Sequence, residues 1–125
     1  MATLNFTDAE LACKCGCGML PNAEFMEDVQ KLRNQYGKSL AVSSAARCPE
    51  HNAKVSGTGR TGPHTTGRAI DLAVSRADAH ALLVLACVMK LFTGIGVQQK
   101  GGGRFLHLDN LPNAPGQPRP TIWSY

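Results

Sequence analysis

The sequence predicts an α+β fold in which a small antiparallel sheet packs on helices. Two stretches, around 22–36 and 76–92, carry apolar residues at helical spacing. Three short segments, 39–44, 68–74 and 104–110, have the apolar or alternating pattern of strands. Gly- and Pro-rich segments separate these elements, and no internal repeat is evident. The 125 residues fit a single domain, 1–125.

The helices in the first half have recognisable start signals. Thr7 with Glu10 forms a capping-box pattern that opens a short helical turn. Asn22 is expected to cap the next helix, which Gly37 ends in a left-handed conformation. The buried face of that helix is expected to carry Phe25, Val29, Leu32 and Tyr36.

Further along, loops alternate with the remaining elements. Ser75 with Asp78 resembles a second capping box, which opens a helix from about 76 to 92. The segments "AARCPEHN" (45–52), 56–67 and the Pro-rich tail that ends in "TIWSY" read as irregular structure, and "GIGV" (94–97) reads as a turn. A tight hairpin is expected at "GGG" (101–103). The expected inward residues of the helix are Ala79, Leu82, Leu83, Ala86 and Met89.

Composition disfavours two classes of protein. The net charge of +4 is spread along the chain without a basic run, and only 6% of residues are aromatic, so no nucleic-acid partner is expected. No apolar run approaches the roughly 18 residues of a transmembrane segment. The start, "MATLNFTDAE", lacks the pattern of a signal peptide, so we expect synthesis in the cytoplasm.

The aspartate in "RAIDLAV" (68–74) requires a partner, since a carboxylate among apolar residues costs several kcal/mol when unpaired. Strand alternation places Asp71 on the opposite face from Ile70 and Leu72. In "RFLHLDN" (104–110), Phe105, His107 and Asp109 likewise share one face. With His64 in the preceding loop, two histidines and one carboxylate would suit a catalytic zinc with a fourth position for water. Alternatively, Asp71 pairs with Arg68 or Arg104, and the loop histidine is only solvent-exposed.

The five cysteines allow several interpretations. Cys13, Cys15 and Cys17 form "CKCGC", with Cys48 and Cys87 elsewhere. The cluster with Cys48 could form a second, structural zinc site, although CxCxC is not the usual CxxC spacing. Small buried thiols in a tight turn are the preferred interpretation, and a disulfide from Cys48 to the cluster is a further alternative.

Several motifs together resemble a known family. "SSAARCPEHNAKV", "GPHTTGRAIDLAV", "FLHLDN" and a late Trp, in this order, are similar to the zinc D-alanyl-D-alanine peptidases, in the branch of small cell-wall peptidases that includes phage endolysins. The N-terminal "ACKCGCG" is also similar to this branch, and the resemblance runs from about Phe6 to Trp123. It implies a hedgehog/D-Ala-D-Ala peptidase-like fold with zinc (Zn²⁺) as cofactor.

The resemblance also implies roles for individual residues. His64, Asp71 and His107 match the three zinc ligands, and Gly67 matches the family glycine between the first two. Arg47 matches an arginine that holds a substrate carbonyl or carboxylate and stabilises negative charge. A pairing of this arginine with Glu50 or a backbone carbonyl is the alternative interpretation.

The chain departs from the family pattern at two places. Gly62 and Pro63 replace the usual Ser-Gln before the first ligand. Arg104 and Phe105 stand where relatives place a general base. The remaining candidate is Asp109, either as the base or as a group that orients His107, and these roles stay open. Trp123 and Tyr125 could line the substrate groove, with a packed core Trp as the alternative.

The resemblance implies a monomeric peptidase acting on peptidoglycan stem or cross-link peptides at D-alanine-containing bonds. Small size, positive charge and the missing signal suggest a phage endolysin that reaches the wall from the host cytoplasm. A wall-peptide-binding or partner-binding zinc domain without activity is the main rival. In a third interpretation, the only metal is a structural zinc on Cys13, Cys15, Cys17 and Cys48.

Overall fold

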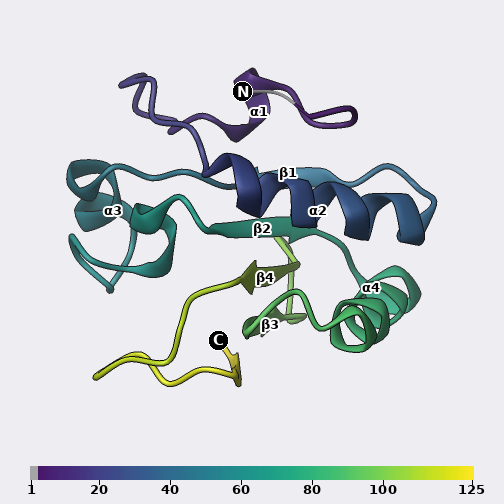
Figure 1. The fold of residues 1–125 in the computed structure, drawn as a ribbon. Coiled ribbons are helices and arrows are strands. Elements are labelled where there is room, and N and C mark those ends of the chain that lie inside the picture. The colour runs from purple at the N-terminus through teal and green to yellow at the C-terminus, as the bar shows by residue number, and fades with distance from the viewer. Residues whose placement is uncertain (1–2) are drawn as a thin grey trace.

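A computed structural model describes residues 3–125, so residues 1–2 of the predicted domain lie outside the described part. The described chain begins with two helices, alternates between strands and helices in its middle and ends with three strands, and all its strands lie in one sheet (Figure 1). The elements are α1 (Asp8–Leu11), α2 (Ala23–Tyr36), β1 (Ala41–Ser44), α3 (Pro49–Val55), the 3-10 helix η1 (Pro63–Thr66), β2 (Ala69–Ala73), α4 (Arg76–Met89), β3 (Gly94–Gln98), β4 (Phe105–Asp109) and β5 (Thr121–Ser124).

The five strands lie in the order β1-β2-β4-β3-β5. The first three pairings across the sheet are antiparallel, as the sequence predicts, whereas β5 pairs parallel with β3. The sheet is therefore mixed, and the α+β prediction is confirmed with this one change. A parallel neighbour is possible because the long connection 110–120 carries the chain from the end of β4 back across the sheet to its β3 edge.

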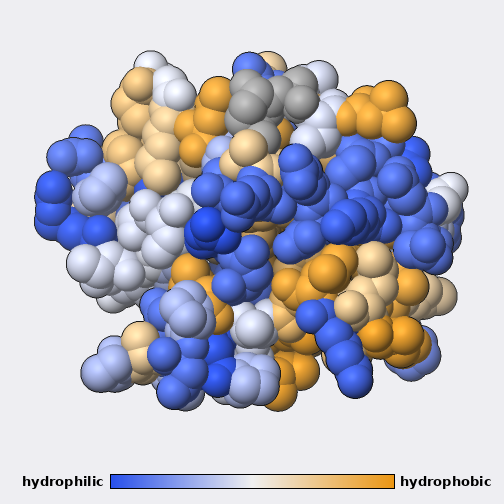
Figure 2. All heavy atoms as spheres, viewed as in Figure 1, coloured by the Kyte–Doolittle hydropathy of each residue, from blue (hydrophilic) through white to orange (hydrophobic). Residues whose placement is uncertain are grey.

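Helices α2 and α4 cover one face of the sheet with a continuous apolar core. Their buried side chains meet the inward residues of β2 and β4, which leaves the opposite face for polar groups. Figure 2 shows the solvent side of α2 as a polar band and an apolar patch in the region of α4. On α4, Val84 and Val88 are exposed large hydrophobic residues. The core of this layer consists mainly of Phe25, Met26, Val29, Leu32, Ile70, Leu72, Leu82, Ala86, Leu106 and Leu108.

The capping signals at the first two helices are confirmed. Thr7 and Glu10 exchange both hydrogen bonds of a capping box. The Asn22 side chain accepts a hydrogen bond from the Phe25 N–H at 3.0 Å, and Gly37 ends α2 with φ of 77°. These ends were predictable because capping chemistry is local in sequence.

Four segments that were expected to lack regular structure form regular elements instead, and one of them is η1 inside 56–67. Pro49 begins α3 inside "AARCPEHN", where the Cys48 sulfur accepts the His51 N–H in place of an oxygen cap. "GIGV" is the body of β3 rather than a turn, and "TIWS" forms β5. Gly-rich and Pro-flanked stretches have weak strand propensity, so only their pairing with neighbouring strands defines them.

Helix α4 differs from the prediction at both ends. Ser75 is its N-cap residue but makes no side-chain capping hydrogen bond, and Asp78 bonds to Lys38 at 2.6 Å instead. The helix ends at Met89 because Lys90 adopts a left-handed conformation. Within residues 3–125, no helix has the length and apolarity required to cross a bilayer.

Candidate metal centre

A single row of residues crosses all five strands on the face that the helices leave open. Strand pairing aligns Asp71 of β2 with His107 of β4, and His107 with Gly96 of β3. Ser44 of β1 and Trp123 of β5 complete the row at its two ends. Each residue lies on the polar face because strand side chains alternate, so the register itself assembles the site.

His64, Asp71 and His107 converge, as the sequence predicts. Their ligand atoms all lie within 4.8 Å of one another, and the side chains are buried, with exposed fractions of 6%, 7% and 2%. The Asp71 Oδ1 atom lies 3.2 Å from His64 Nε2 and 3.1 Å from His107 Nδ1. Of the three ligands, two come from the centre of the sheet and one from η1.

The hydrogen bonds on the outer sides of both rings show what this arrangement requires. His64 Nδ1 donates to the Ala45 carbonyl at 2.7 Å, so a neutral ring presents a lone pair at Nε2 toward Asp71. His107 lies between two carboxylates, with Nε2 2.8 Å from Asp109 Oδ2. Lone pairs that face a carboxylate repel it unless a proton or a cation lies between them. The residues therefore fit a divalent metal ion bound by two imidazoles and one carboxylate.

Electrostatics within the triad follow the same pattern. Burial raises the pKa of Asp71, but the contacts with His107 and His64 lower it by a larger amount, so the pKa of the carboxyl lies well below its usual value. Burial lowers the pKa of His107, whereas the carboxylates of Asp109 and Asp71 raise it, with a net increase. The site thus holds Asp71 as an anion, the form that binds a cation.

Arg47 lies beside the triad with its guanidinium fixed by neutral partners. Its Nε donates to Ser44 Oγ at 3.2 Å and its Nη1 to Asn52 Oδ1 at 2.9 Å. The remaining Nη2 lies 3.7 Å from Asp71 Oδ2. Glu50, the alternative partner, instead accepts a hydrogen bond from Arg60 at 3.2 Å.

The side chains beside Asp71 are thus the two histidines and Arg47, rather than the two arginines considered from the sequence. Arg104 bonds to the Gly101 carbonyl at 2.8 Å. Of the other two histidines, His80 is exposed and His51 partly buried.

Asp109 lies behind His107 and is completely buried. Arg119 donates two hydrogen bonds to it, from Nε to Oδ1 and from Nη2 to Oδ2, both at 2.9 Å. The Leu111 N–H donates a third at 3.3 Å. Burial raises the pKa of Asp109, but His107 and Arg119 lower it below its usual value. The carboxylate is therefore engaged by neighbours on both oxygens.

Two glycines of β3 provide the space for this polar face. A Cβ atom at Gly94 would collide with the Asp109 carboxylate, and one at Gly96 would lie 2.8 Å from Trp123 Nε1. The Trp123 ring packs at 5.0 Å from the His107 ring, at 53°. "GIGV" thus carries glycine at alternate positions because Asp109 and Trp123 fill the space that side chains at these positions would need.

An open cavity of about 870 Å³ lies over the triad. Trp123 is half-buried in its wall rather than in the core, and Tyr125 lies beside it. Burial raises the pKa of Tyr125, so its hydroxyl stays neutral at physiological pH. The cavity walls also include Arg47, Gly62, Pro63, Phe105, Gln117 and Arg119.

Sequence reasoning did not identify Arg119, Asn52 or Ala45 as parts of the site. Arg119 stands in the Pro-rich tail, ten residues from Asp109, where no local pattern indicates its partner. Asn52 is 1% exposed and also donates to Thr58 Oγ1 at 2.8 Å, so it links Arg47 to the loop before η1. Asn52 belongs to the "CPEHN" motif, which the sequence indicated to be a loop. The sequence therefore offered no sign that the Asn52 side chain is buried.

Comparison with known proteins agrees with this geometry. No curated protein sequence matches the chain. The family described as Peptidase M15 matches residues 4–109, a span that contains His64, Asp71 and His107. The match covers most of the chain and ends on the last residue of β4. The chain therefore belongs to the Peptidase M15 family and holds a buried His-Asp-His metal-binding triad on the open face of its sheet.

Proposed function

We propose that the protein is a zinc peptidase that cleaves peptidoglycan stem or cross-link peptides at D-alanine-containing bonds. The observation that carries the proposal is the convergence of His64, Asp71 and His107 at an open cavity in a chain of a peptidase family. A catalytic metal needs protein ligands on one side and access for substrate on the other. The cavity supplies that access.

The donor set supports zinc as the metal. Nitrogen and oxygen ligands at about 2.1 Å in a tetrahedron lie about 3.4 Å apart, close to the 3.1 and 3.2 Å measured here from Asp71 to the two rings. Two imidazoles and one carboxylate are a common set in zinc peptidases. When bound, zinc supplies Lewis-acid polarisation of a peptide carbonyl and an acidified water.

The other cavity residues fit a small anionic peptide. Arg47 is held in place by Ser44 and Asn52, with Nη2 the least engaged of its nitrogens. A fixed guanidinium can bind a substrate carboxylate or stabilise charge that develops on a carbonyl. Stem peptides carry such carboxylates, and Trp123 offers a flat apolar wall beside the metal ligands.

In this proposal, Asp109 orients the imidazole ring of His107 and does not transfer a proton. Its Oδ2 bonds to the ring nitrogen of His107 that points away from Asp71, and Arg119 engages both oxygens. A carboxylate in that position fixes the ring orientation and makes the opposite nitrogen a better ligand. A general base must instead reach the attacking water at hydrogen-bond distance.

One observation favours a second candidate function. Among the residues that the structure describes, Asp71 is the single carboxylate in the cavity wall, and it belongs to the triad. A domain without a carboxylate base could bind wall peptide through its metal and Arg47 without cutting it. This rival predicts zinc and peptide binding with no products.

We extend the proposal to the biological setting. Positive charge at neutral pH favours approach to an anionic bacterial envelope. Together with the small size of the domain, this supports a monomeric endolysin of a phage, acting on the host wall after release from the cytoplasm.

The test is digestion of purified peptidoglycan from several chemotypes, with products identified by mass spectrometry and zinc measured in each protein. Wild type, His64→Ala, Asp109→Asn and the surface control Arg60→Ala form the set. We expect stem-peptide fragments from wild type and Arg60→Ala only, and their masses identify the bond.

The outcomes separate the candidates. Zinc retained by Asp109→Asn with full affinity, together with lost activity, would contradict the orienting role and restore Asp109 as the base. The wild type could instead bind zinc and wall peptide but release no fragment from any chemotype. That result would contradict the peptidase proposal and support the binding domain.

A further inference from the structure

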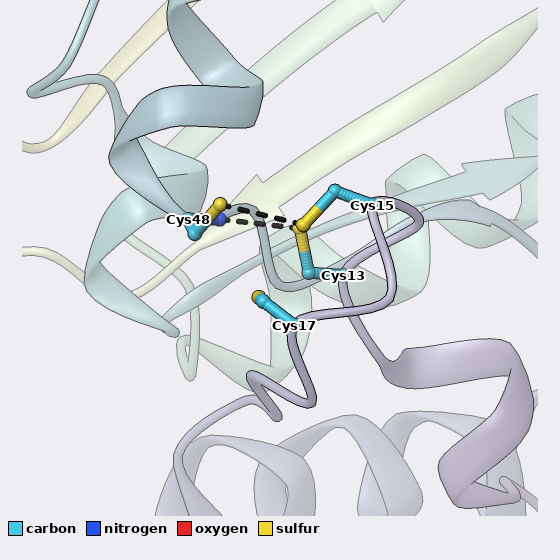
Figure 3. Close-up of side chains that lie close together, drawn as sticks. All are labelled: Cys13, Cys15, Cys17 and Cys48. Carbon is cyan, nitrogen blue, oxygen red and sulfur yellow. Dashed lines mark hydrogen bonds between the residues drawn. The ribbon is translucent and has the colours of Figure 1, made fainter.

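Four cysteines form a second cluster of metal-ligand type, away from the cavity. Cys13, Cys15 and Cys17 come from the loop after α1, and Cys48 lies at the start of α3. Figure 3 shows the loop and the helix end brought together so that the cysteines surround a common centre. All four sulfurs lie within 4.8 Å of one another.

The spacing of these sulfurs matches a bound metal better than a disulfide. Cys15 Sγ lies 3.4 Å from Cys13 Sγ and 3.6 Å from Cys48 Sγ. Sulfurs around a tetrahedral zinc, each about 2.3 Å from the metal, are about 3.8 Å apart. A disulfide requires about 2.05 Å and uses two sulfurs, which would leave the other two crowded beside it.

Exposure and hydrogen bonding do not fit simple buried thiols. Cys13 is 3% exposed, but Cys15 and Cys17 are exposed to solvent, so hydrophobic burial does not explain why they face the cluster. The Cys48 N–H donates to Cys13 Sγ at 3.3 Å, and the His51 N–H donates to Cys48 Sγ at 3.4 Å. Backbone donors aimed at sulfur stabilise thiolate ligands.

The loop backbone is shaped to bring alternate residues inward. Gly16 and Gly18 have φ of 86° and 87°, a left-handed conformation that glycine adopts without strain. The Cys13 N–H bonds to the Met19 carbonyl at 2.9 Å and closes the loop around the sulfurs. The CxCxC spacing therefore serves as three ligands from one tight turn.

We propose that Cys13, Cys15, Cys17 and Cys48 bind a structural zinc ion that fastens the N-terminal segment to the loop bearing Arg47. All four coordination positions come from protein, as in structural zinc sites. The same contact region includes the hydrogen bond from the Ala46 N–H to the Leu11 carbonyl at 3.2 Å. Ala45, whose carbonyl orients His64, lies in this loop as well. The proposal does not depend on peptidase activity.

The test counts zinc per chain in reduced, full-length protein. Wild type should carry two zinc ions, His64→Ala one, and His64→Ala with Cys15→Ala and Cys17→Ala none. Both substituted cysteines are exposed, so the apolar core stays intact. The matched control is Cys87→Ser on α4, an exposed cysteine outside the cluster, which should keep both ions.

Two further measurements keep the proposal testable if a variant folds poorly. Cobalt bound to His64→Ala should show thiolate-to-metal charge transfer, and native thiol titration should find Cys87 reactive while the cluster reacts only after chelation. Amide exchange at residues 46–48 should accelerate in the Cys15→Ala, Cys17→Ala protein. Zinc-free His64→Ala without the charge-transfer band, or a mass and thiol count that reveal a disulfide in the cluster, would overturn the proposal.

Discussion

Arg119 and Asp109 form a two-bond ion pair directly behind the metal-facing histidine, with both bonds at 2.9 Å. Arg119 comes from the connection to β5, outside the part of the chain that the family match covers. The pair therefore couples the C-terminal segment to the ligand His107. Loss of the pair should therefore lower both the stability of the fold and the affinity of the triad for metal.

Arg119→Ala should lower the free energy of unfolding by about 3 kcal/mol, because the buried Asp109 carboxylate loses its ion pair with the guanidinium. Denaturant unfolding in the presence of chelator measures this without a contribution from metal. Arg60→Ala is the control, since its pair with Glu50 is exposed and should contribute about 0.5 kcal/mol or less. Equal effects of the two substitutions would contradict this role of Arg119.

Asp109→Asn should weaken metal affinity at the triad about 10- to 100-fold, since the ring of His107 loses its charged partner. Competition with a chromophoric chelator gives the affinity, measured in a background with Cys15→Ala and Cys17→Ala so that one site is followed. An unchanged affinity would show that His107 does not depend on this carboxylate.

Arg47→Lys should lower kcat for peptide cleavage about 100-fold while metal content stays unchanged. Lysine keeps the positive charge but lacks the planar guanidinium that donates to Ser44 and Asn52 at the same time. Steady-state kinetics on a synthetic stem peptide, with zinc analysis of the same samples, tests this. A rise in KM alone would indicate that Arg47 contributes only to ground-state binding.

Gly94→Ala and Gly96→Ala should differ in severity. The added methyl at residue 94 meets the Asp109 carboxylate, which Arg119 holds in place, and should cost about 2 kcal/mol or more of unfolding free energy. At residue 96 it meets the half-buried Trp123, which can shift, so we expect about 1 kcal/mol and altered tryptophan fluorescence. Trp123 is the single tryptophan, so the signal is unambiguous.

Gly102→Ala provides the control for both substitutions, because a Cβ there has nothing within 4 Å. Its effect on unfolding should stay within about 0.5 kcal/mol. Reversal of the order, with residue 96 the more sensitive, would mean that Asp109 is freer to move than its hydrogen bonds indicate.

Chelation should destabilise the wild type by about 4 kcal/mol for each of the two sites when free zinc is initially about 1,000-fold above the dissociation constant of that site. Differential scanning calorimetry with and without chelator gives the shift in Tm. The protein with His64→Ala, Cys15→Ala and Cys17→Ala together should show no shift. A shift that persists in it would place metal elsewhere in the chain.

Local chemistry made part of this structure predictable. Strand alternation placed Asp71 and His107 on one face, and the capping residues Thr7 and Asn22 marked two helix starts. His64 was a candidate because it lies in the loop just before the strand of Asp71, and the family resemblance then matched it to a zinc ligand. These features depend on neighbours in sequence or on ordered motifs.

The remainder depends on contacts between distant segments. Nothing near Gly94 or Gly96 indicates that Asp109 and Trp123 fill the missing side-chain space, so the segment resembled a turn. The role of Arg119 likewise follows only from the path of residues 110–120 across the sheet. Propensity cannot reveal a strand whose residues are chosen to leave room for others.

Because the metal ligands belong to the row of residues from Ser44 to Trp123, metal binding depends on the correct register of the strands. A slip of one residue in β4 against β2 would turn His107 toward the helices and place a leucine beside Asp71. Metal would bind only the correctly paired sheet, so it would lower the free energy of that pairing alone. A nascent chain that meets metal while its strands assemble should therefore favour the native arrangement over shifted ones.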